Sequence, residues 1–185
     1  MNSLVSICIP TFNGSKFLEE ALVSIESQTY KNYEVVISDD ASTDETLKIV
    51  QDFKEKVNFP VYIYHHKPKG IGANWNNCIR KANGKFIKFL FQDDVLLPSC
   101  IEEQLAVLSS YNNIGEPPTV FFRKSVVKEI GYFREDLHQI LDYEFYYRLL
   151  RSYNIAIINK RLVNFRLHQL QATNINRNKP IKDYE

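Results

Sequence analysis

Short apolar runs alternate with amphipathic stretches through the first hundred residues of the chain. The runs have the length of strands, and the stretches between them repeat apolar side chains at helical spacing. Strands are predicted at residues 4–9, 33–38, 61–65 and 86–91, and helices at residues 16–28, from 42 onward, at 75–82 and from about 98 onward. This order predicts βαβ units, and therefore a mainly parallel sheet with right-handed crossovers and helices on its faces.

Two polar segments predict where helices begin and end. Ser42 and Glu45 have the spacing of a capping box, in which Ser42 caps the helix and Glu45 reaches back. Asn83 and Gly84 follow the helical apolar face that starts at Trp75, and they predict the C-terminal stop of that helix.

The pattern is less regular after residue 108. It predicts a strand at 119–123, a helix at 142–151, and a closing pair of strands at 155–159 and 162–168. The polar stretch from residue 169 onward predicts a surface tail. With 185 residues, the chain has the length of one domain with a sizeable core.

Composition and charge narrow the classes of function. Lys and Arg total 23 against 22 Asp and Glu, so no basic excess indicates a nucleic-acid partner. Cys8, Cys78 and Cys100 are far apart and form no CxxC pair, which predicts reduced, buried thiols rather than disulfides or a zinc site. No signal peptide or apolar run of about 20 residues is apparent. These features predict a soluble, cytoplasmic protein, either free or docked on the inner face of the membrane.

Polar residues follow three of the predicted strands, where ligands bind in sheets of this kind. They are Pro10-Thr11-Phe12-Asn13, Asp39-Asp40-Ala41-Ser42 and Gln92-Asp93-Asp94. No glycine-rich phosphate loop follows any of the strands. Bound phosphates would then need another counter-charge, and carboxylates that hold a divalent cation can supply it. The alternative for Asp93 and Asp94 is a solvated turn that caps the next helix.

The residues after the first two strands also have alternative interpretations. Asp39 and Asp40 can form a second set of metal ligands, accept hydrogen bonds from a base or a ribose, or cap the following helix. Phe12 has a flat face that can stack on a base, and its alternative role is a hydrophobic staple for the next helix.

Nine segments in this order and spacing resemble one family, the GT2 glycosyltransferases of GT-A fold. The likeness covers nearly the whole chain. The segments are VSICIPTFN at 5–13, SQTYKNYEVVI at 27–37, DDASTD at 39–44, GANWN at 72–76, NGKFI at 83–87, QDD at 92–94, GYF at 131–133, DYEF at 142–145 and FRLH at 165–168. The resemblance implies a Rossmann-like, mainly parallel α/β sheet flanked by helices, with a smaller acceptor-side part at the C-terminal end. Residues 1–108 would bind the nucleotide sugar, and residues 109–185 would supply the acceptor side of the same domain.

The resemblance also implies roles for the residues that match the family motifs. Phe12 would stack on the base, and Asp40, alone or with Asp39, would accept the N3–H of uracil or thymine. Asp94 matches the last aspartate of the DxD motif, which binds Mn²⁺ or Mg²⁺, and His168 would be a further metal ligand. The nucleotide site would be completed by Pro10, Thr11, Asn13, Asn74 and Asp93.

The implied activity is inverting transfer of a sugar from a UDP- or dTDP-linked donor to a glycan or lipid-linked acceptor. Asp142 matches the catalytic base of the family's xED motif, although Leu141 replaces the usual preceding Glu. The alternative role of Asp142 is a helix N-cap, and Glu144 and Arg148 have the spacing of a surface ion pair.

The stretch between Leu108 and Gly115 is shorter than in the family. This departure keeps open an alternative function, a catalytically inactive module that binds nucleotide sugars. A phosphoacceptor receiver domain is disfavoured, because His65-His66-Lys67-Pro68 follows the third strand where that class needs an isolated Asp.

Overall fold

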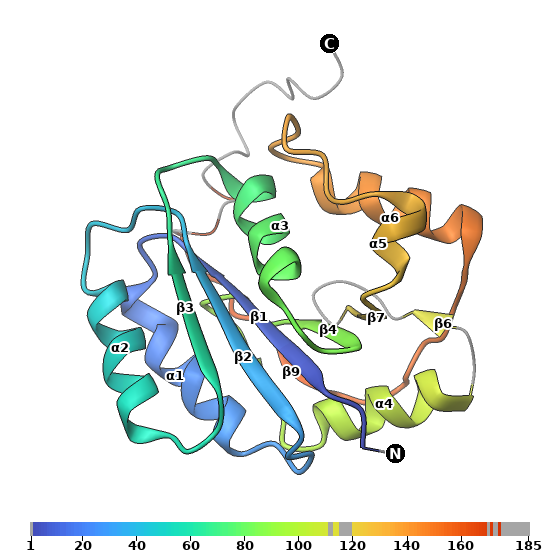
Figure 1. The fold of residues 1–185 in the computed structure, drawn as a ribbon, viewed down its shortest axis with the longest axis horizontal. Coiled ribbons are helices and arrows are strands. Elements are labelled where there is room, and N and C mark those ends of the chain that lie inside the picture. Colours follow the sequence, from blue (N-terminus) through green and yellow to red (C-terminus); the bar gives the residue numbers. More distant parts are fainter. Residues whose placement is uncertain (1, 111–112, 115–119, 170, 172–173, 175–185) are drawn as a thin grey trace.

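A five-stranded sheet forms the centre of the fold in the computed structural model (Figure 1), which describes residues 2–110, 113–114, 120–169, 171 and 174. The strand order is β3-β2-β1-β4-β7, and only β7 is antiparallel to its neighbour. The bounds are Val5–Thr11 for β1, Tyr33–Asp39 for β2, Val61–His65 for β3, Phe86–Phe89 for β4 and Phe121–Arg123 for β7. The predicted mainly parallel α/β sheet is confirmed.

Helices cover both faces of this sheet. One apolar core contains side chains of α1 (Ser15–Glu26), α2 (Thr46–Lys56) and α4 (Cys100–Ser110). The other contains side chains of α3 (Ile71–Lys81), α5 (Val126–Ile130) and α6 (Leu141–Ser152), and Figure 1 shows the two helical layers. Alternate strand residues enter opposite cores: Ile7 and Ile9 lie in the first, and Cys8 lies in the second. None of the described helices is long and apolar enough to cross a membrane.

The short strands of the second half pair with earlier segments. β5 (Val95–Leu96) is antiparallel to β9 (Val163–Asn164), and β6 (Asn113–Ile114) is parallel to β8 (Asn154–Ile155). The predicted closing pair of strands is therefore wrong, since the two segments bond to different partners. The β5–β9 pairing has a consequence for the site, because it brings the residues after β9 beside the acidic turn that precedes β5.

The predicted capping box of α2 is wrong. The helix begins at Thr46 after Glu45, and Glu45 makes no side-chain capping bond. The Ser42 hydroxyl instead donates to Asp39 Oδ1 at 2.5 Å, and the Thr46 backbone N–H donates to Asp44 Oδ1 at 3.0 Å. Ser42 is thus engaged by the end of β2, and the carboxylate next to the helix is that of Asp44.

Gly84 serves as a point of close approach between two backbones. The predicted stop after α3 is confirmed in position, but the described residues with positive φ do not include Gly84. A Cβ at this position would lie 2.6 Å from both the backbone N and the Oγ of Ser6. Only glycine therefore lets the start of β4 reach β1.

Gly84→Ala is expected to lower the free energy of unfolding by roughly 1–3 kcal/mol, because the added methyl group overlaps the β1 backbone. Urea denaturation followed by circular dichroism measures the change. Lys85→Ala, at an exposed neighbouring position, is the control and should stay within ~0.5 kcal/mol of wild type. Equal stability of Gly84→Ala and Lys85→Ala would contradict the steric account.

Candidate functional site

The carboxyl ends of β1, β2 and β4 lie at one edge of the sheet. β1 is parallel to both neighbours, and Thr11 at its end is opposite Asp39 at the end of β2. Asn13 and Ala41, just beyond these strands, both have positive φ, which turns the chain sharply at the edge. Three of the predicted site segments are therefore brought together.

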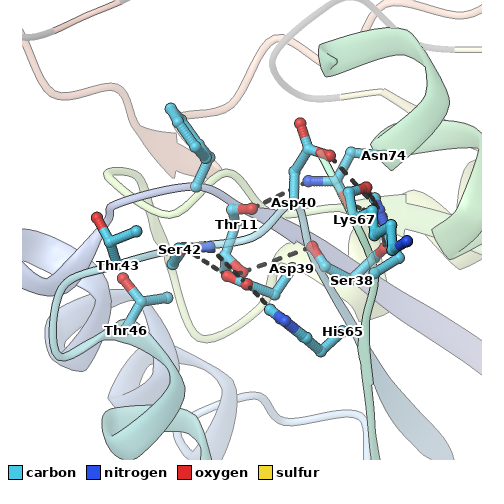
Figure 2. A network of polar contacts seen from close by, with 12 residues as sticks. Thr11, Ser38, Asp39, Asp40, Ser42, Thr43, Thr46, His65, Lys67 and Asn74 are labelled. Carbon is cyan, nitrogen blue, oxygen red and sulfur yellow. Dashed lines mark hydrogen bonds and ion pairs between the residues drawn. The ribbon is translucent and has the colours of Figure 1, made fainter. Parts of the chain in front are cut away.

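Asp39 joins the ends of the first three strands (Figure 2). Its buried carboxylate accepts the Thr11 hydroxyl at 2.9 Å, and the backbone N–H and hydroxyl of Ser42 at 2.9 and 2.5 Å. His65 Nδ1 contacts Asp39 Oδ2 at 3.0 Å. Both carboxylate oxygens are therefore engaged by protein groups, and Asp39 holds the edge of the sheet together.

Asp40 faces the loop that leads into α3. Its Oδ1 accepts the backbone N–H of Lys69 at 2.7 Å, and its Oδ2 accepts that of Gly70 at 2.9 Å. His66 Nδ1 lies 3.4 Å from Oδ1. α3 has no side-chain cap of its own, so the Asp40 carboxylate supplies the counter-charge near the helix N-terminus.

Phe12 presents its ring to solvent at the end of β1, with 53% of the residue exposed. Its backbone is fixed by Gln92, which follows β4: Phe12 N–H donates to Gln92 Oε1 at 2.9 Å, and Gln92 Nε2 donates to Phe12 O at 3.1 Å. The sequence pattern did not predict this paired contact, although Gln92 directly precedes the two aspartates after β4. Asn13 accepts the Thr43 N–H at 2.9 Å and thereby joins the loops after β1 and β2.

Pro10, Thr11 and Asn74 are buried around the same edge. Pro10 lies within β1 opposite Ser38, and Asn74 in α3 donates through Nδ2 to Thr11 O at 3.0 Å. The Asn74 side chain therefore holds α3 against the end of β1, as the labelled residues of Figure 2 show.

Asp93 and His168 form a contact across the acidic turn. His168 Nε2 lies 2.9 Å from Asp93 Oδ2, and both side chains are largely buried. His168 also packs against Phe17 of α1, with ring centroids 4.5 Å apart. The segment after β9 thus brings together two predicted site residues that are 75 positions apart in the sequence.

Asp94 points away from this contact. It is 2% exposed, and its Oδ1 accepts the backbone N–H of Arg166 at 3.1 Å. Burial raises the pKa of Asp94 to about 6, and the negative charge of Asp93 acts in the same direction. The resemblance assigned the metal to Asp94, whereas the carboxylate that contacts His168 is that of Asp93.

Lys88 lies fully buried in β4, ahead of the acidic turn. Its Nζ has no hydrogen-bond partner in the part of the chain that the structure describes. Burial lowers the pKa of Lys88, while Asp94 and Cys100 counter that effect. The two side chains act on each other electrostatically, since Asp94 raises the pKa of Lys88 and Lys88 lowers the pKa of Asp94.

The side chains of the acidic turn can be compared with the ligands that a divalent cation requires. Within the described residues, no group of three or more His, Cys, Asp or Glu converges. Asp93 and His168 still offer one carboxylate and one imidazole side by side. Such a pair fits a Mn²⁺ or Mg²⁺ ion whose remaining ligands are substrate phosphates and water.

Asp142 lies in the first turn of α6, and Ile140 is the N-cap, so Asp142 is not the cap itself. Its Oδ1 accepts the Tyr143 backbone N–H at 2.8 Å. Burial, followed by the charge of Asp142, raises the pKa of Tyr146.

Aromatic rings connect α6 with α3. Phe145 of α6 stacks on Phe133 at 4.0 Å between centroids, and Phe133 meets Trp75 of α3 edge-on at 5.2 Å. Glu144 and Arg148 form the predicted ion pair at 2.6 Å. Arg148 also donates to two backbone carbonyls before α6, so this pair anchors the helix.

A family comparison identifies this arrangement of strand ends. Residues 6–166 match the model of glycosyl transferase family 2. The chain belongs to this family. The matched stretch includes every site residue discussed above except His168.

Relatives and structural neighbours of this family 2 chain extend the comparison. The uncharacterized glycosyltransferase RP339 of Rickettsia prowazekii is 28% identical over 225 residues, which cover 98% of this chain and 69% of that protein. S. aureus TarS 1-349 in complex with UDP-GlcNAc has a TM-score of 0.78 at 23% identity, over 91% of this chain and 60% of that TarS fragment. The mannosyltransferase PcManGT of Pyrobaculum calidifontis, in complex with GDP-Man and Mn²⁺, has a TM-score of 0.71 at 19% identity, over 85% and 55% of the two chains. The predicted GT-A fold is confirmed.

Proposed function

We propose that this family 2 chain transfers a sugar from a nucleoside diphosphate sugar to an acceptor hydroxyl. The observation that carries the proposal is the convergence of Phe12, Asp40 and Asp93 at one edge of the sheet, with Gln92 tying the end of β1 to the acidic turn. Phe12 offers an exposed ring for a base, Asp40 an acceptor for its N–H, and Asp93 a carboxylate for a cation on the diphosphate.

The hydrogen bonds of Asp40 favour a uracil or thymine base. A carboxylate has about four acceptor positions, of which the Lys69 and Gly70 amides occupy two. The His66 ring, with Nδ1 3.4 Å from Oδ1, stands against a third without donating to it. Uracil and thymine present a single imide N–H, whereas guanine presents two neighbouring donors that need two positions. TarS was solved with UDP-GlcNAc and PcManGT with GDP-Man, so proteins of this fold bind different bases. We therefore assign the selection of the base to side chains such as Asp40.

The divalent cation is assigned to Asp93 and His168, with Asp94 held inward beneath the turn. PcManGT was solved with Mn²⁺, which supports metal use on this fold. When bound, Mn²⁺ or Mg²⁺ would neutralise charge on the departing nucleoside diphosphate. Thr11 and Asn74 hold the neighbouring strand end in place, and Pro10, Asn13 and Asp39 shape the nucleotide site around it.

Asp142 is assigned as the general base of an inverting transfer. A base that takes the acceptor proton must face the sugar from the side opposite the diphosphate. We assign residues 1–108 to donor binding and residues 109–185 to the acceptor side, where a glycan or lipid-linked hydroxyl would bind. A cytoplasmic site, free or at the inner membrane face, suits such an acceptor.

Binding of free uridine without metal tests the nucleobase site. Asp40→Ala is expected to weaken uridine affinity by about 10- to 150-fold, since a hydrogen bond to a charged group contributes ~1.5–3 kcal/mol. Phe12→Ala should cost a similar factor, because stacking on a base contributes ~1–3 kcal/mol. Isothermal calorimetry measures both.

Tyr147→Ala is the control for this experiment, because it removes an exposed aromatic ring on α6. Its uridine affinity should equal that of wild type. Wild-type affinity in both Asp40→Ala and Phe12→Ala would refute the assignment of the base to this edge.

A further inference from the structure

His66 follows β3 and contacts three separate parts of the candidate nucleobase site. Its Nδ1 lies 2.8 Å from the carbonyl oxygen of Lys67 and 3.4 Å from Asp40 Oδ1. Its Nε2 lies 3.2 Å from Asn74 Oδ1 and 3.3 Å from Ser38 Oγ. A single ring thereby touches the end of β2, the loop at residues 66–70 and the first turns of α3.

The directions of these hydrogen bonds follow from their partners. A carbonyl oxygen only accepts, so His66 Nδ1 donates to Lys67 O. Asn74 donates through Nδ2 to the carbonyl oxygen of Thr11, which turns its Oδ1 toward the imidazole. With the proton on Nδ1, the imidazole accepts at Nε2, and the Ser38 hydroxyl at 3.3 Å is the group that can donate to it. The ring also lies against Oδ1 of the asparagine that holds α3 against β1.

The loop at 66–70 depends on this ring. A Cβ on Gly70 would meet nothing within 4 Å, and its φ is +91°, so neither packing nor side-chain restriction fixes the chain there. α3 has no side-chain cap. The two backbone amides that bind Asp40 lie in this weakly packed stretch. His66 fixes the loop from one side, and Asp40 holds it from the other.

We propose that His66 is a positioning residue of the nucleobase site, and this rests on the proposed function. By holding the 66–70 loop against Ser38 at the end of β2, His66 keeps the Lys69 and Gly70 amides on Asp40. It thereby leaves one carboxylate position open to a base with a single imide N–H. Without the imidazole, the loop moves off Asp40, and both the affinity for uridine and the discrimination against guanosine fall.

Three variants at this position, with calorimetry of uridine and guanosine, test the proposal. His66→Ala is expected to weaken uridine binding about 10-fold and to reduce the preference for uridine over guanosine. His66→Asn places an amide N–H near the position of Nδ1, and His66→Gln places an amide oxygen, a hydrogen-bond acceptor, near that of Nε2. Each restores one of the two contacts and should recover part of the lost affinity. Mn²⁺ affinity should stay unchanged in all three.

The control is His138→Ala, an exposed histidine outside this network, which should bind uridine as wild type does. With a turnover substrate, His66→Ala should raise the donor KM and leave kcat unchanged. The proposal is overturned if His66→Ala binds uridine within twofold of wild type and keeps the same preference over guanosine. If the alanine variant fails to fold, the same result in both His66→Asn and His66→Gln overturns it. A wild-type protein that binds neither uridine nor UDP would instead refute the proposed function.

Discussion

Asp142→Asn is expected to bind donor and Mn²⁺ as wild type does but to transfer sugar about 10²–10⁴-fold more slowly. Asparagine keeps the shape of the side chain and can still accept the Tyr143 N–H, but it cannot take the acceptor proton. Because the substitution is conservative and lies in the first turn of α6, stability should change little. Initial rates at saturating donor measure the loss.

Asp136→Asn provides the matched control, since Asp136 is an exposed acid six positions earlier that pairs with Arg134. Its rate should equal that of wild type, and NMR of the product should show an anomeric configuration opposite to that of the donor. Retention of configuration, or an active Asp142→Asn enzyme, would overturn the mechanism. If wild type binds UDP-sugars but never releases UDP, with or without acceptors, the inactive binding module is the correct function.

Asp93→Asn is expected to weaken Mn²⁺-dependent UDP binding by about 10²-fold, because metal stabilisation of phosphate charge amounts to several kcal/mol. His168→Ala should also weaken Mn²⁺ binding, since its Nε2 lies beside Asp93 Oδ2. Both variants should bind uridine normally, because the base is bound by other residues. Calorimetric titration of UDP with and without Mn²⁺ measures the effect.

Asp94→Asn distinguishes the two assignments of the metal. Asp94 is turned toward the Arg166 backbone and the buried Lys88. Its replacement should therefore lower the stability of the fold and have little effect on Mn²⁺ affinity. Glu45→Gln is the control, since Glu45 is an exposed acid at the start of α2 that pairs with Lys48. A larger loss of Mn²⁺ affinity in Asp94→Asn than in Asp93→Asn would return the metal to Asp94.

The strands and helices of the first half could be predicted because their signals are local. The run at 33–38 is mostly apolar and is buried on both faces, and such a run has few alternatives between two helical stretches. The positions of Phe12 and Asp40 at the functional edge follow from the same reasoning, because residues after parallel strands meet there.

The contacts that define the site more finely could not be predicted, because they join residues far apart in the chain. The Gln92 bonds to Phe12 span 80 positions, and the contact of Asp93 with His168 depends on the pairing of β5 with β9. Two-residue strands carry almost no periodicity, so the pairing of β5 with β9 leaves no recognisable pattern in the sequence. Which of two adjacent aspartates faces outward depends in turn on Arg166.

The stretch between Leu108 and Gly115 belongs to the part of the chain that we assign to the acceptor side. The alignment with RP339 extends over 225 residues, more than the 185 of this chain, so the relative carries residues that this chain lacks. The prediction of a shortened segment at 109–114 lies partly outside the described residues, which omit 111–112.

The most direct test of the central claim is the thermal stability of the wild-type protein with UDP, CDP and GDP, each with Mn²⁺ or with EDTA. At a ligand concentration one hundred times the dissociation constant, UDP with Mn²⁺ should stabilise the fold by about 2.7 kcal/mol. CDP and GDP should give smaller shifts at the same concentration, and EDTA should reduce the shift with UDP. Equal shifts with all three nucleotides, or none with any, would contradict a nucleoside diphosphate site built on Phe12, Asp40 and Asp93.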